Sequence, residues 1–136
     1  MDKITILNAV DCQAEATVEV AKTLSVDQQD MICRAESMGA KKRLRILASA
    51  EVGSADVTID TISGSIDGTN FVILQAFTGL QITAAGEAKC TNPLLMEITA
   101  PLVGMTKLRL DATAAALDGS NHITLLAELL LANLCN

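Results

Sequence analysis

Apolar and polar residues alternate most clearly over residues 55–77, where the pattern predicts two β-strands joined by a tight turn. Asp67-Gly68 lies between the two apolar runs. This dipeptide favours a turn because glycine adopts positive φ at no steric cost and aspartate tolerates it. After the turn, residues 71–77 are apolar at both parities. This second run predicts a central strand that is covered on both faces.

The strand before the turn changes phase partway along. Val57 and Ile59 lie at one parity, whereas Ile62 and Gly64 lie at the other. Because successive residues of a strand point to opposite faces, a change of phase indicates an extra residue in the strand. The sequence therefore predicts a β-bulge near Asp60-Thr61.

Further strands are predicted at residues 3–7, 12–22, 31–35, 41–47 and 94–98. Residues 12–22 also fit an Ala-rich helix, but the β-branched Thr17, Val18 and Val20 favour the strand. The segment 78–89 is small, polar and punctuated by glycine, which indicates a surface connection with room for one short strand. Other breaks are predicted at residues 27–30, 37–40, 49–54 and Asn92-Pro93.

Residues 106–113 form the clearest one-sided strand in the chain. Its inward positions are Leu108, Leu110 and Ala112, and its outward ones are Lys107, Arg109 and Asp111. The basic cluster 41–47 alternates in the same way and places Arg43 and Arg45 on its charged face. Such a face is typical of a solvated sheet surface, and the alternative is docking on an acidic protein.

The C-terminal apolar run has two interpretations. Asp118-Gly119 precedes it, as Asp67-Gly68 precedes the earlier apolar run. Its leucines favour a helix, whereas its place after a turn in a strand-rich chain favours a buried strand, which we predict. The run serves equally well as a core strand or as a contact between subunits. The residues of this candidate interface are Ile123, Leu125, Leu126, Leu129, Leu130 and Leu131.

Short strands with turn signals every 8–12 residues or so, and no βαβ alternation, predict an all-β protein. We expect a single antiparallel β-sandwich or jelly roll over residues 1–136. A chain of 136 residues suits one domain with a sizeable core.

Composition excludes several classes of function. The net charge of −6 argues against nucleic-acid binding, which needs clustered Lys and Arg. No apolar run reaches the ~18 residues of a membrane span, and the N-terminus has neither a basic leader nor an apolar signal core. With two Phe and no Tyr or Trp, the chain also lacks stacking platforms for bases or sugars.

The residues suggest no catalytic chemistry. The single histidine, His122, has no evident partner for nucleophile–base catalysis, and phosphate-binding and EF-hand patterns are missing. We therefore expect no enzyme, no metal and no cofactor. The cysteines form no CxxC pair and are expected to be buried, reduced thiols: Cys12, Cys33, Cys90 and Cys135.

Val57-x-Ile59, the run Ser63-Gly-Ser-Ile-Asp-Gly-Thr-Asn-Phe71 and the strand Lys107-Leu-Arg-Leu110 together resemble a pattern of tailed-bacteriophage virion β-sandwich proteins. The hairpin also resembles that of discoidin-like sandwiches, from which this chain departs in having no Trp or Tyr. The resemblance covers roughly residues 40–113, and its motif is mostly turn chemistry.

The resemblance implies a capsid cement or decoration protein on the virion exterior, made in the host cytoplasm. Such a protein binds the major capsid protein and bridges coat subunits, and we expect a homo-oligomer. The Arg43/Arg45 and Lys107/Arg109 faces are candidates for docking on an acidic coat surface. The alternative function is a host-surface or carbohydrate-binding module of a phage tail or fibre.

Overall fold

The computed structural model describes residues 2–12, 16–52, 54–85, 89–90, 94–115 and 122–131. Within them the chain is mostly β, so the predicted all-β class is confirmed at this level. One α-helix occurs in the described part, α1 (Val26–Ser37). The strands are β1 (Asp2–Cys12), β2 (Ala16–Val18), β3 (Ala21–Thr23), β4 (Lys42–Val52), β5 (Ser54–Ser65), β6 (Val72–Ala85), β7 (Lys89–Cys90), β8 (Leu94–Ile98), β9 (Lys107–Ala115) and β10 (His122–Leu131).

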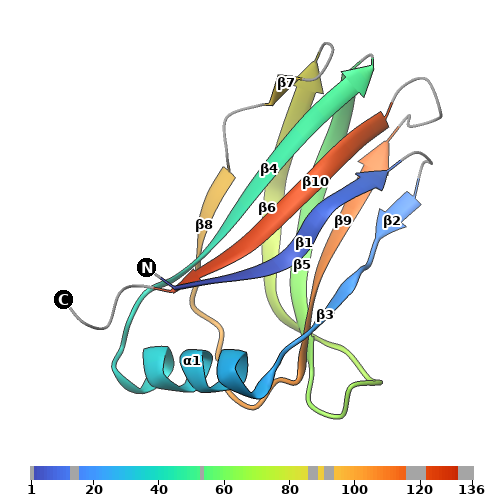
Figure 1. Ribbon diagram of the computed structural model, residues 1–136. Coiled ribbons are helices and arrows are strands. Elements are labelled where there is room, and N and C mark those ends of the chain that lie inside the picture. Colours follow the sequence, from blue (N-terminus) through green and yellow to red (C-terminus); the bar gives the residue numbers. More distant parts are fainter. Residues whose placement is uncertain are drawn as a thin grey trace.

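The strands form two antiparallel sheets. Sheet A has the order β1-β10-β4, and both β7 and β8 pair with the far edge of β4. Sheet B has the order β9-β5-β6, and β2 and β3 both pair with β9. Figure 1 shows sheet A in front of sheet B, with α1 across the lower end.

The inward side chains of both sheets build one hydrophobic cluster. Leu44, Ile46 and Ala48 of β4 enter it from sheet A. Leu108, Leu110 and Ala112 enter it from β9 of sheet B, as the alternation in residues 106–113 predicts. These side chains are fully buried, and burial of a Leu or Ile side chain contributes about 2 kcal/mol each.

The predicted bulge and turn in the 55–77 hairpin are both confirmed. The pairing of β5 with β6 and with β9 shifts register between Ile59 and Thr61. The extra residue lets Val57, Ile59 and Ile62 all point into the core despite their different parity. At the turn, Gly68 has φ of 83°, a conformation that side chains with a Cβ rarely adopt.

The second strand of that hairpin differs from expectation. Among the described strands β6 pairs with β5 alone, so it is an edge strand rather than a central one, and Val72 and Ile73 are exposed. It also continues to Ala85, so the surface connection predicted over residues 78–89 is a strand over its first two thirds. The apolar run 71–77 belongs to an edge strand with exposed apolar side chains. Period-two patterning cannot distinguish such a strand from a central strand that is covered on both faces.

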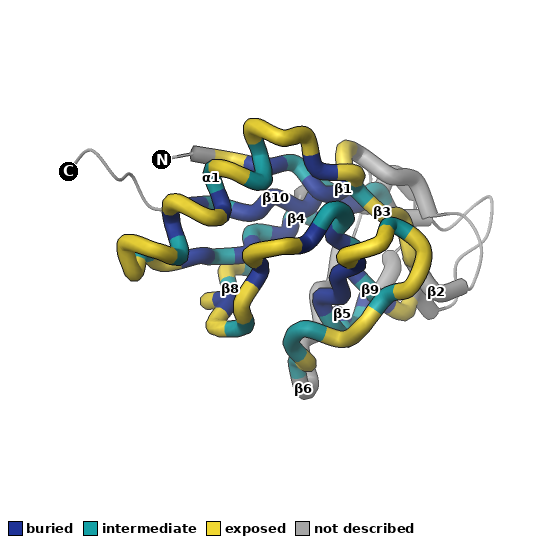
Figure 2. Tube along the Cα trace, turned by 90° about the horizontal axis from the view of Figure 1, so that it is seen from below, coloured by how far each residue is buried: buried dark blue, intermediate teal, exposed yellow. Residues whose placement is uncertain are grey.

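The helix α1 was not predicted, and it replaces the expected polar break at 27–30 and strand at 31–35. The sequence held a signal for it: Ser25 and Gln28 form a capping box, with Ser25 Oγ accepting from Gln28 N at 3.1 Å and Gln28 Oε1 accepting from Ser25 N at 2.9 Å. Gly39 ends the helix with φ of 68°. Ile32 and Ala35 bury its inner face against the sheet ends, and yellow exposed residues mark its outer face in Figure 2.

Of the remaining expectations, some are confirmed and others are wrong. The strand predicted at residues 94–98 is β8, and the C-terminal run is the strand β10. The turn expected over 49–54 is wrong, since β4 reaches Val52 and β5 begins at Ser54. Cys33 lies exposed on α1, which corrects the prediction that it is buried. Asn92-Pro93, Asp118-Gly119 and Cys135 lie outside the described residues.

Candidate interaction surfaces

The outer face of sheet A carries charged and apolar side chains in three rows across the strands. Strand register defines the rows. The first row is Lys3, Leu130, Arg43 and Glu97; the second is Thr5, Glu128, Arg45 and Leu95; the third is Leu126 and Leu47. We call these ten residues the sheet A face. In Figure 1 this face is turned toward the viewer, and no other element crosses it.

Glu128 lies at the centre of the sheet A face and is only 4% exposed. Its carboxylate accepts from Arg45 Nε at 3.0 Å, contacts Arg45 Nη2 as well, and pairs with Lys3 Nζ at 3.0 Å. The Arg45 hydrogen bond holds the pKa of Glu128 below its ordinary value, against the opposing effect of burial. Arg43 and Glu97 form no ion pair with any described residue, so each keeps a free charge.

The candidate interface residues of β10 divide by parity. Leu125, Leu129 and Leu131 point into the core and are at most 1% exposed. Leu126 and Leu130 point outward and are half-buried on the sheet A face. Ile123 is in β10, and its side chain is outside the described part. Any surface that β10 shares with a neighbour is therefore carried by the outward leucines.

The outer face of sheet B holds a different polar cluster, centred on Asp111. The Asp111 carboxylate accepts from Thr61 Oγ1 at 2.9 Å and Ser63 Oγ at 2.6 Å, and from Arg109 Nε at 2.7 Å. The Arg109 guanidinium also lies 4.3 Å from the centroid of the Phe71 ring, a cation–π distance. This cluster satisfies its own hydrogen bonds and leaves little charge unpartnered.

The two candidate docking pairs do not form one basic surface. Arg43 and Arg45 belong to sheet A, whereas Lys107 and Arg109 belong to sheet B, so the pairs are on opposite outer faces. Arg45 and Arg109 are also already engaged by carboxylates. Each face therefore offers a partner mixed charge rather than a basic strip.

The turn residues expected at Asp67-Gly68 form a hydrogen-bonded hairpin tip. Asp67 Oδ1 accepts from the backbone N–H groups of Thr69 and Asn70 at 2.8 Å each and from Ser65 Oγ at 2.9 Å. Asn70 Nδ2 donates to Asp67 Oδ2 at 2.7 Å. The backbone hydrogen bonds from Asn70 and Thr69, with smaller side-chain contributions, hold the pKa of Asp67 well below its ordinary value.

Exposed apolar side chains surround that tip. Ile66, Val72 and Ile73 are 69%, 58% and 67% exposed. Ile66 and Val72 line an open hollow of about 340 Å³ with Gly64, Asp67 and Asn70. A Cβ on Gly64 would come within 2.7 Å of Leu74 Cδ1, so a larger residue at this position of the hollow would require the Leu74 side chain to shift. We call Ile66, Val72 and Ile73 the apolar tip.

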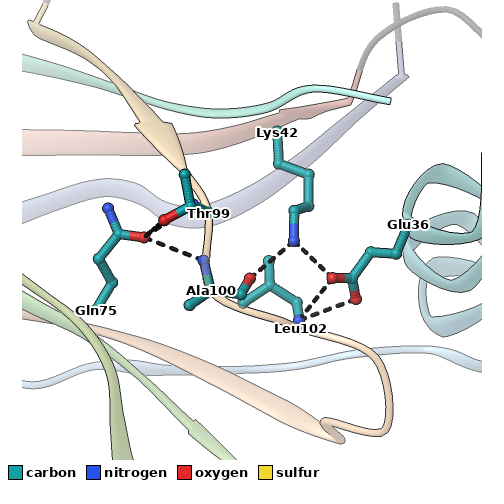
Figure 3. A network of polar contacts seen from close by, with 6 residues as sticks. All are labelled: Glu36, Lys42, Gln75, Thr99, Ala100 and Leu102. Carbon is teal, nitrogen blue, oxygen red and sulfur yellow. Dashed lines mark hydrogen bonds and ion pairs between the residues drawn. The ribbon is translucent and has the colours of Figure 1, made fainter. Parts of the chain in front are cut away.

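A third polar network ties α1 to the β8–β9 connection (Figure 3). The buried Lys42 donates to Glu36 Oε2 at 2.6 Å and to Ala100 O at 2.8 Å, and Glu36 accepts from Leu102 N at 2.9 Å. Gln75 of the edge strand β6 accepts from Thr99 N at 2.9 Å. Each buried charge is paired, so the network stabilises the end of the sheets and offers no unpartnered reactive group.

Sequence patterns alone did not identify these networks. Their members are polar residues of ordinary type whose partners lie far along the chain, and only the strand register brings them together. No group of three or more metal-ligating side chains occurs among the described residues. The helix in the described part is too short to cross a membrane.

No family model matches the sequence, and a search of curated proteins finds none that is similar to it.

Proposed function

We propose that this protein is a structural virion protein that binds the outside of a bacteriophage capsid and stabilises contacts between coat subunits. Its apolar tip is the contact with the major capsid protein. The observation that carries the proposal is the exposure of three large aliphatic side chains beside the hydrogen-bonded turn: Ile66 and Val72 line the open hollow, and Ile73 follows Val72 on the edge strand β6. Exposure of such apolar groups to water costs free energy, and burial against a partner recovers it.

The strand order supports a jelly-roll form for this proposal. Counting β2 with β3 and β7 with β8 gives two four-stranded sheets, β1-β10-β4-β7/β8 and β2/β3-β9-β5-β6. Eight strands in two antiparallel sheets with crossovers of this kind are the pattern of jelly rolls, which viral capsid domains use. The edge strand β6 places the apolar tip at one end of sheet B, where a neighbouring subunit can reach it.

The rival function is a host-surface or carbohydrate-binding module. The polar cluster around Asp111 offers hydroxyls and a carboxylate, but each is already hydrogen-bonded within the sheet. Phe71 has Arg109 over its ring, which occupies a face that a sugar would stack on. These contacts favour the capsid function over the rival.

The test is reconstitution on capsids that lack the protein. Purified wild-type protein should co-sediment with the capsids at a fixed stoichiometry and raise their thermal disruption temperature. Ile73→Glu should lower capsid affinity at least about tenfold, because it places a charge where apolar surface must be buried.

Val26→Glu is the matched control, since Val26 is also an exposed aliphatic residue, 73% exposed at the start of α1. It adds the same charge away from the apolar tip and should bind like the wild type. Equal binding by both variants would refute the apolar tip as the contact. Specific binding to a glycan array, with no binding to capsids, would favour the rival function.

A further inference from the structure

We propose that the sheet A face is a self-complementary surface through which two copies of this chain form a two-fold symmetric dimer. The proposal specifies the homo-oligomer component of the proposed function. It rests on the order of charges in the first two rows defined above: across the line between β10 and β4, Lys3 lies opposite Glu97 and Glu128 lies opposite Arg45.

A two-fold axis along that line, parallel to the strands, places the rows of the two copies over one another. In the first row Lys3 faces the Glu97 of the second copy, and Glu97 faces its Lys3. In the second row Glu128 faces the second copy's Arg45, and Thr5 faces its Leu95. In the third row Leu126 faces Leu47. Lys3, Glu97, Glu128 and Arg45 then each meet an opposite charge, Arg43 meets Leu130, and leucines of the third row meet leucines.

The other two-fold axis in the plane of the sheet gives no such match. An axis across the strands at the second row would place Arg45 over a second Arg45 and Glu128 over a second Glu128. Like charges facing each other cost free energy, so this arrangement is disfavoured. Of these two axes, the charge order favours the one parallel to the strands, which gives the isologous geometry of a closed dimer.

The groups that the dimer needs are available. Glu97 is exposed and without an ion pair among the described residues, and the Lys3 side chain is 53% exposed. Arg45 and Glu128 already form a pair, and the second copy completes a square of alternating charges around the axis. Leu47, Leu126 and Leu130 are half-buried on a face that no described element covers, and Leu95 is 52% exposed.

The size of the face sets the expected strength. Three strand spacings and four residue steps span roughly 15 Å by 13 Å, which is small against the ~800 Å² that each partner buries in a standard interface. The dimer should therefore be weak in free solution. Attachment of many copies to one particle would raise its occupancy through effective concentration.

The experiment uses charge reversals that complement each other. In Lys3→Glu two acidic groups face each other at both ends of the dimer, and in Glu97→Lys two basic groups do. Each variant alone should dimerise at least about fivefold more weakly than the wild type in sedimentation equilibrium up to millimolar concentration. An equimolar mixture should form heterodimers at wild-type affinity, because each reversed charge then meets its opposite.

Melting curves show whether Lys3→Glu still folds after losing its contact with Glu128. If it does not, Leu126→Ser is the substitute and should weaken the dimer, whereas Ile73→Ser on sheet B should not. A wild type that stays monomeric at millimolar concentration would overturn the proposal, as would a mixture no tighter than the single variants. Capsid binding is scored separately with Ile73→Glu, so loss of the dimer with retained capsid binding refutes the dimer alone.

Discussion

The outer face of each sheet holds a largely buried carboxylate, and the two carboxylates have different kinds of partner. Glu128 on sheet A is held by two cations from the neighbouring strands β4 and β1. Asp111 on sheet B is held by two hydroxyls from β5 and by Arg109 of its own strand. Sheet A is left with free charges and half-buried leucines around its ion pair, whereas the polar cluster of sheet B is complete.

This difference shows that a charged strand face is not by itself a docking face. Arg43/Arg45 and Lys107/Arg109 follow the same alternating pattern in the sequence. Arg45 and Arg109 each pair with a carboxylate, whereas Arg43 and Lys107 have no ion pair among the described residues. The faces differ instead in the half-buried leucines beside the sheet A pair, and a face that combines free charge with apolar groups gains more from a partner.

The largest expected effect tests which β10 side chains belong to the outer face. Leu129→Ala removes a fully buried side chain and should lower the free energy of unfolding by about 2–5 kcal/mol. Leu130→Ala, one residue further along and pointing outward, should cost under about 1 kcal/mol. Urea denaturation of both variants measures the difference. Equal losses would mean that β10 has two core faces.

An intermediate effect compares the two carboxylates directly. Glu128→Ala leaves Arg45 and Lys3 facing each other and should cost about 2 kcal/mol, which is less than the ~3–5 kcal/mol for a fully buried pair because both cations reach solvent. Asp111→Ala removes hydrogen bonds from two neutral hydroxyls, those of Thr61 and the buried Ser63, and should cost about 1 kcal/mol. The same urea measurement checks both. A larger loss for Asp111→Ala would reverse the contrast between the faces.

The smallest effect is on pH dependence. Because the pKa of Glu128 is lowered in the folded state from its ordinary value of 4.5, the ionised group stabilises the fold. That contribution is complete above the unfolded-state pKa and is lost as pH falls through the folded-state pKa. The stability difference between wild type and Glu128→Gln should therefore be constant near neutral pH and shrink on acidification below about pH 4.5. A stability difference between the two proteins that does not change with pH would show that the charge of Glu128 does not stabilise the fold.

Local chemistry made much of the fold predictable. The bulge at Asp60-Thr61, the Gly68 turn, the strand β8 and the one-sided strand β9 all follow from residue parity and turn residues within a few positions. The capping box at Ser25 was an equally local signal for α1, and the β-like residues 31–35 obscured it. The candidate site was less predictable, because its contacts join distant segments.

The sequence by itself determined which side of a strand is apolar, where the chain turns and where a strand takes an extra residue, since φ/ψ preference and period-two alternation act over a few residues. Only the tertiary structure decided that β6 is an edge, that Arg45 meets Glu128 across 83 positions, and that the two basic pairs face opposite directions. The physical reason is that a side chain's partners are set by strand order and register. These depend on how the whole chain packs and not on its neighbours in sequence.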